Sequence, residues 1–154
     1  MSKPITTETI KALRDQTGVS VMECKKALEE AEGDTDKAIA ILKTRSAGMV
    51  LKKSDRTLGA GTVAAYIHNT AQVGAMLLLS CETDFVAKNE AFVALAREIA
   101  MHVAATRPET VEALLAEPFI KDSSKTIQDL LSEATQKFGE RVEVSEMNCL
   151  SVGR

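Results

Sequence analysis

The segment Val73–Cys81 limits the folds open to this chain more than any other feature of the sequence. Its centre, residues 75–79, is apolar at every position. A strand in an antiparallel sheet with one solvated face would alternate apolar and polar residues instead. The preceding segment, Thr62–His68, does alternate, and Asn69–Gln72 between them is typical of a turn. We therefore predict a hairpin whose second strand is covered on both faces.

The remainder of the second half predicts helices and one further strand. Two longer segments carry apolar stripes at helical spacing, Glu90–Ala105 and Thr126–Phe138, the latter with Ser124 as its cap and Gly139 as its stop. The other expected elements are a short helix, an extended segment and a last strand whose alternation breaks at Ser145-Glu146, as in a β-bulge: Glu109–Leu115, Pro118–Ile120 and Arg141–Val152.

Three short helices are predicted for residues 1–47, and they share a minimal core because few of their residues are large and apolar. The first covers Thr7–Gln16 with Thr6 or Thr7 as its cap, the second starts from the cap Ser20 and stops at Gly33, and the third is capped by Asp34 and fades at Ser46–Gly48.

These elements define an α+β chain in two domains. We expect a three-helix domain in residues 1–47, a linker in 48–60, and an α+β core domain in 61–154. The core would be a three-stranded antiparallel sheet with helices packed on one face. Nothing in the chain is left to cover the other face, so we predict a homodimer in which two sheets pack face to face.

Composition excludes several functions. A chain of 154 residues with net charge −3 has neither the size of a large multidomain enzyme nor a broad positive field for nucleic acid. The longest apolar run is far shorter than the roughly 20 residues of a membrane helix, and the first residues lack a secretory signal. We expect a cytoplasmic protein that contacts neither nucleic acid nor membrane directly.

No residue pattern predicts covalent chemistry. Cys24, Cys81 and Cys149 are widely spaced and are expected to be reduced and mostly buried. His68 and His102 have no triad partner at a suggestive spacing and are expected at the polar surface. Phosphate-loop, dinucleotide and metal motifs are missing from the sequence, so we expect no enzyme activity, cofactor or metal.

Two segments are left unexplained by folding alone. Val21 and Met22 fall outside the apolar stripe of their helix, so they either form an exposed patch for a partner or pack against the third helix. In Thr83-Asp84-Phe85-Val86, Asp84 is most simply a helix cap and Phe85 a core residue. The alternative is an apolar wedge beside a carboxylate, inserted into the surface of another protein.

At these residues the sequence resembles the bacterial elongation factor Ts family, guanine-nucleotide exchange factors for elongation factor Tu. The resemblance covers most of the chain. It is carried by Leu13-Arg14, Gly33-Asp34, the run Thr17–Leu28, the run Cys81–Ala87 and Phe138-Gly139-Glu140.

The resemblance implies that residues 1–47 form a ubiquitin-associated-like domain that docks on elongation factor Tu. Arg14, Val21, Met22 and Lys25 would be its contacts. It further implies that Thr83–Val86, above all Asp84 and Phe85, disturb the partner's magnesium and phosphate site so that GDP leaves. The chain is similar to the short form with a single core subdomain, whose members complete the sheet by dimerising.

Departures from the family lead us to expect weaker exchange. The chain is shorter between Ala105 and Pro118, Val21 replaces a methionine, and Ser145 and Glu146 replace basic residues. Two other functions stay open from the sequence. One is an adaptor or scaffold that keeps the fold without exchange activity, and the other is a small enzyme with Cys81 as its nucleophile.

Overall fold

The computed structural model of the chain describes residues 2–153, which form two compact units. The first unit extends to Ser54 and also takes in residues 132–139; the second comprises residues 55–131 and the chain from Glu140 onward. The predicted α+β class and the three-stranded antiparallel sheet are confirmed. No helix in the described part of the chain is long and apolar enough to cross a membrane.

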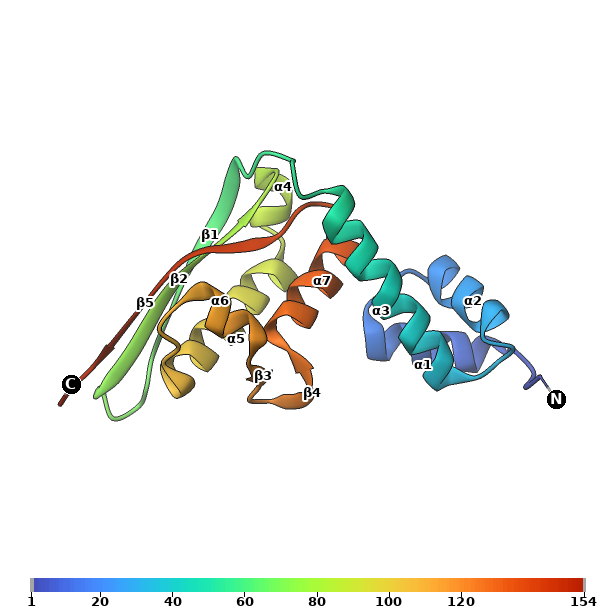
Figure 1. Ribbon diagram of the computed structural model, residues 1–154, viewed down its shortest axis with the longest axis horizontal. Coiled ribbons are helices and arrows are strands. Elements are labelled where there is room, and N and C mark those ends of the chain that lie inside the picture. Colours follow the sequence, from blue (N-terminus) through green and yellow to red (C-terminus); the bar gives the residue numbers. More distant parts are fainter. Residues whose placement is uncertain (1, 154) are drawn as a thin grey trace. The chain divides into compact units, whose positions relative to one another are not determined.

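The first unit contains α1 (Thr7–Thr17), α2 (Val21–Glu30) and α3 (Thr35–Lys52), drawn in blue to teal in Figure 1. Each helix starts where its cap was predicted, because the side chains of Thr6, Ser20 and Asp34 accept backbone N–H groups of the first turn. The helices enclose a small core of eight buried residues: Leu13, Val19, Cys24, Ala27, Leu28, Ala31, Ala38 and Leu42.

Two features of this unit differ from the prediction. Helix α3 does not fade at Ser46–Gly48 but continues to Lys52, since the residues after Gly48 include no helix breaker. The buried Ser46 hydroxyl also hydrogen-bonds the side chain of Gln136, in the later part of α7 (Ile127–Phe138). A helix distant in sequence therefore contributes to the first unit.

The sheet of the second unit has the order β1 (Ala60–Ile67), β2 (Val73–Cys81), β5 (Glu143–Ser151), with both pairs antiparallel. The predicted bulge is confirmed: Leu78 pairs with Glu146 and Leu79 with Val144, so Ser145 has no partner in the ladder. Its hydroxyl instead lies 2.6 Å from that of Ser80.

Helices cover one side of this sheet. After the single turn α4 (Asp84–Ala87), the long α5 (Glu90–Thr106) packs across β1 and β2, and α6 (Val111–Ala116) lies toward β5 (Figure 1). The residues buried between the sheet and α5 include Leu77 and Leu79 on β2 and Phe92, Ile99 and Val103 on α5. This layer is the core of the second unit.

Two details beyond α5 correct the sequence-based expectations. The extended segment at Pro118 is part of a small hairpin of β3 (Pro118–Phe119) and β4 (Asp122–Thr126). Helix α7 is capped by Thr126 and not by Ser124: the Asp129 amide donates to the Thr126 hydroxyl at 3.1 Å, and the Thr126 amide donates to the Asp129 carboxylate at 2.9 Å.

The prediction of a surface position for His102 is wrong, because this side chain is fully buried in α5. Its Nδ1 accepts the Ile120 amide at 3.3 Å, so Nε2 carries the proton and donates to the Glu117 carboxylate at 2.7 Å. The histidine thus fastens the hairpin of β3 and β4 to α5. His68 is exposed, as predicted.

Candidate functional site

The turn α4 presents Phe85 to solvent. Thr83 is its N-cap, and its hydroxyl accepts the Val86 amide at 3.4 Å. Val86 and Ala87 are buried, whereas 86% of Phe85 is exposed and Asp84 beside it is exposed too. The simpler sequence interpretation is therefore wrong on both residues: Asp84 is not the cap, and Phe85 is not in the core. The arrangement is an apolar ring and a carboxylate on a turn whose other side is anchored.

The entry to α4 is held from a distant segment. The carboxylate of Glu140 accepts the amides of Glu82 and Thr83 at 3.0 and 2.9 Å, and it accepts the Thr83 hydroxyl at 2.7 Å. Sequence analysis gave Glu140 no role at the site, although Phe138-Gly139-Glu140 was among the matching motifs. Residues that are 57 positions apart leave no periodic signal of such a contact.

Cys81 lies at the base of the same turn, in surroundings that do not favour its thiolate. Its buried thiol donates to the Thr83 carbonyl at 3.3 Å. Burial, together with the nearby carboxylates of Glu140, Asp84 and Glu82, raises the pKa of this thiol. Less of it is therefore thiolate at neutral pH, which is the opposite of what nucleophilic catalysis needs.

The second candidate segment lies where α1 joins α2 in the first unit. Gly18 has φ +70°, in the left-handed region, and its amide donates to the Arg14 carbonyl at 2.7 Å, which ends α1. Val19 is buried, and the Cys24 thiol donates to its carbonyl at 3.6 Å. The turn that leads into α2 is therefore fixed by the unit's own core.

The residues predicted to contact a partner are exposed beyond this turn. Val21 is 51% and Met22 67% exposed, so the alternative in which they pack against α3 is wrong. Arg14 and Lys25 are exposed as well, and Lys25 Nζ lies 3.8 Å from Glu29 Oε1. These four residues belong to the first unit, whereas Thr83–Val86 belong to the second.

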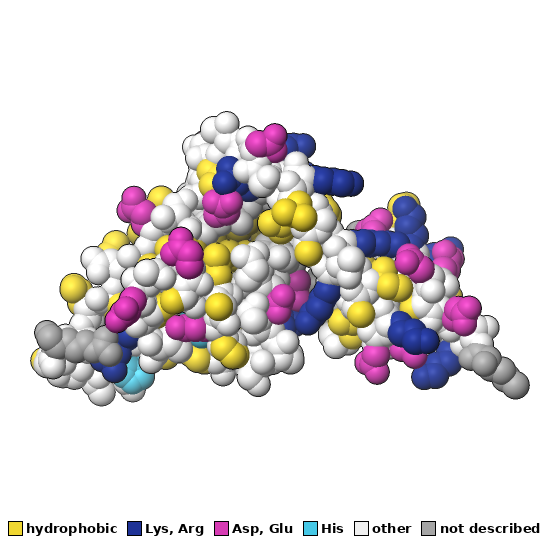
Figure 2. All heavy atoms as spheres, viewed as in Figure 1, with side chains coloured by type: hydrophobic (Ala, Val, Ile, Leu, Met, Phe, Trp, Pro, Cys, Tyr) yellow, Lys and Arg dark blue, Asp and Glu magenta, His cyan; other side chains and the backbone are white. Residues whose placement is uncertain are grey.

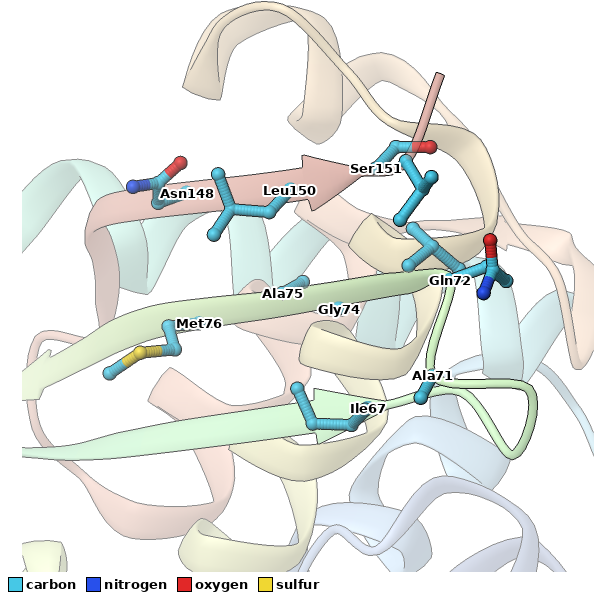
Figure 3. Close-up of a pocket in the computed structure, with 11 residues that line it drawn as sticks. Ile67, Ala71, Gln72, Gly74, Ala75, Met76, Asn148, Leu150 and Ser151 are labelled. Carbon is cyan, nitrogen blue, oxygen red and sulfur yellow. The ribbon is translucent and has the colours of Figure 1, made fainter. Parts of the chain in front are cut away.

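The side of the sheet opposite α5 exposes an apolar surface. Ile67, Met76 and Leu150 come from three neighbouring strands and lie on this side, around a hollow of ≈ 430 Å³ (Figure 3). Met76 is 54% and Leu150 74% exposed, and Val63 belongs to the same side. We call these residues the open sheet face. Exposed apolar side chains in such number on one face indicate an interaction surface.

The face drawn in Figure 2 carries charged side chains of both signs. On this face, basic and acidic side chains are interspersed rather than separated by sign. Among the described residues, no group of three His, Cys, Asp or Glu side chains could hold a metal ion.

Comparison with known proteins gives a consistent result. The family model described as Elongation factor TS matches residues 82–154. Elongation factor Ts of Leptospira biflexa is 36% identical over 194 aligned positions, covering 97% of this chain and 98% of the relative. The protein of that name from Thermosipho melanesiensis is 34% identical, with 97% and 99% covered.

A further relative, elongation factor Ts of Clostridium botulinum, is 38% identical over 150 residues, which cover 97% of this chain but 49% of the relative. The alignment to the Leptospira protein is longer than the 154 residues of this chain, so that relative carries residues that are missing here. This chain is therefore shorter even than a relative that it matches from end to end.

Proposed function

Because the chain belongs to the elongation factor Ts family, we propose that it accelerates the release of GDP from elongation factor Tu. It is a translation elongation factor, and nucleotide exchange on its partner is its task. Exchange of this kind makes and breaks no covalent bond. We further propose that it works in the cytoplasm and needs no cofactor of its own.

The observation that carries this proposal is the exposure of Phe85, at 86%, on a turn anchored by Val86 and Ala87. An exposed ring on a turn anchored in this way can enter another protein with little loss of conformational freedom. Asp84 brings a negative charge to the same place, and a carboxylate close to a bound magnesium and phosphate would weaken their hold on each other. In this proposal, Thr83 and Val86 hold the turn in place. Asp84 and Phe85 insert into elongation factor Tu.

Thermodynamic linkage explains how intrusion releases nucleotide. A factor that binds nucleotide-free elongation factor Tu more tightly than the GDP-bound form must lower the affinity for GDP by the same ratio. GTP in excess then binds the empty site and displaces the factor. No consumption of the factor is needed, so small amounts act repeatedly.

The first unit supplies affinity in this proposal. We assign residues 1–47 to a ubiquitin-associated-like domain and 61–154 to the core domain, with 48–60 as the linker, into which α3 extends as far as Lys52. The ubiquitin-associated-like domain would contact elongation factor Tu through Arg14, Val21, Met22 and Lys25. The support is their exposure next to a turn that the core of the unit holds in place.

We also propose that the open sheet face pairs with its copy in a homodimer. Val63, Ile67, Met76 and Leu150 would be buried between two sheets packed face to face. Sedimentation equilibrium at high micromolar concentration should give twice the chain mass, and Met76→Glu should return the monomer. A monomer without the substitution would remove this part of the proposal.

Stopped-flow release of a fluorescent GDP analogue from elongation factor Tu tests the main proposal. Added protein should raise the release rate in proportion to its concentration until the rate saturates. The alternative of a non-exchanging adaptor predicts binding to elongation factor Tu without any change in this rate. Absence of acceleration at every concentration would therefore contradict the proposed function.

A further inference from the structure

The sheet ladder between β2 and β5 ends just before α4. Its last pair is Ser80 with Glu143. Beyond that pair the two strands diverge, so the amides of Glu82, Thr83 and Arg141 have no ladder partner. Such groups need another acceptor or water.

Two carboxylates replace the missing ladder bonds in a reciprocal way. Glu140 accepts the amides of Glu82 and Thr83, and Glu82 in turn accepts the Arg141 amide at 2.6 Å. Arg56 Nη1 lies 3.3 Å from the other oxygen of Glu82, Oε1. Each chain segment thus uses its own side chain to bind the backbone of the other.

The position of Glu140 is itself fixed by its neighbours. Gly139 before it has φ +71°, the left-handed conformation that ends α7. Val142 after it is buried. The carboxylate is half-buried and accepts three hydrogen bonds, all from the segment that starts α4. Charge-assisted bonds of this kind are short and directional.

We propose that Glu140 is a positioning residue for nucleotide exchange, whose carboxylate fixes the first peptide groups of α4 and thereby keeps Phe85 directed outward. This inference rests on the proposed function. Glu140 acts through Thr83 and does not itself need to contact elongation factor Tu. Without it, one turn of helix anchored by Val86 and Ala87 alone would sample other orientations of Phe85.

A matched pair of substitutions separates the effect of the length of the Glu140 side chain from the effect of its charge. Glu140→Asp keeps the charge but withdraws the carboxylate by one methylene group. Glu140→Gln loses the charge but keeps the reach: its oxygen can accept both amides, and its NH₂ group can donate to the Thr83 hydroxyl. Glu112→Ala, which removes an exposed carboxylate on α6, is the control.

The readouts are the stopped-flow release of the GDP analogue from elongation factor Tu and hydrogen exchange at the Glu82 and Thr83 amides. We expect Glu140→Asp to lower the saturating release rate about tenfold, with little change in the concentration for half-maximal effect, and to speed amide exchange. Glu140→Gln should stay within about twofold of the unsubstituted protein. A second variant, Thr83→Val, keeps both amides and should slow release by an intermediate factor.

Unchanged release rates in Glu140→Asp and Thr83→Val would overturn the inference while leaving the proposed function intact. Slowed release in Glu140→Gln together with an unchanged rate in Glu140→Asp would also overturn it, since charge and not position would then be the cause. Failure of the unsubstituted protein to accelerate release would overturn the proposed function and, with it, this role of Glu140.

Discussion

Phe85 and Phe92 lie seven residues apart on adjacent helices, yet one is 86% exposed and the other is fully buried. Phe92 sits on the inner stripe of α5, which packs against the sheet. Phe85 sits on a single turn whose buried positions are taken by Val86 and Ala87. Two identical side chains therefore have opposite tasks, and the difference lies in what holds the backbone beneath them.

An exposed apolar side chain can therefore be held in as definite a position as a side chain in the core. Phe92 is fixed by its own burial. Phe85 is fixed indirectly, by its buried neighbours and by the bonds of Thr83 to Glu140. Stability should therefore depend on Phe92 and exchange on Phe85, and substitutions at either site can be used to separate the two effects.

The largest effect is expected for Phe92→Ala. Truncating a fully buried ring removes its burial and leaves a cavity, so the free energy of unfolding should fall by about 3–5 kcal/mol. Chemical denaturation with urea measures this directly. A loss below about 1 kcal/mol would mean that the α5 layer can collapse around the cavity, and that the contrast with Phe85 is weaker than proposed.

A smaller effect is expected for Thr83→Ala, which removes the cap of α4 and its hydroxyl bond to Glu140. Loss of a capping side chain typically costs about 1 kcal/mol. GDP release should slow as well, because Phe85 loses part of its support. Thr83→Ser, which keeps the hydroxyl, is the control and should behave as the unsubstituted protein in both assays.

The smallest effect on folding is expected for Met22→Ala in the first unit. Met22 is exposed, so the free energy of unfolding should change by no more than about 0.5 kcal/mol. If Met22 contacts elongation factor Tu, the concentration needed for half-maximal acceleration should rise. Leu28→Ala, at a fully buried position of the same helix, should instead cost about 2–5 kcal/mol.

Local signals explain what the sequence predicted well. The caps Thr6, Ser20 and Asp34 act within three residues of their own position, and so they can be recognised directly from the sequence. The bulge at Ser145 could be predicted for the same reason, because it interrupts an otherwise regular alternation. The capping box of Thr126 and Asp129 is a local signal of the same kind, since its two residues lie three positions apart in the sequence.

Long-range contacts explain what the sequence could not give. Apolar spacing cannot tell whether Phe85 or Val86 faces the core, since both lie in one turn of helix. The burial of His102 depends on Glu117 and Ile120, which approach it only through the hairpin of β3 and β4. The bonds of Glu140 to the start of α4 likewise join segments that only the sheet brings together.

The most direct test of the account is stopped-flow release of a fluorescent GDP analogue from elongation factor Tu by the Phe85→Ala variant, with its urea denaturation measured alongside. The account predicts acceleration at least about tenfold below that of the unsubstituted protein, and a free energy of unfolding within about 0.5 kcal/mol of it. A variant that folds normally and still accelerates release fully would contradict the central claim that exposed Phe85 drives exchange.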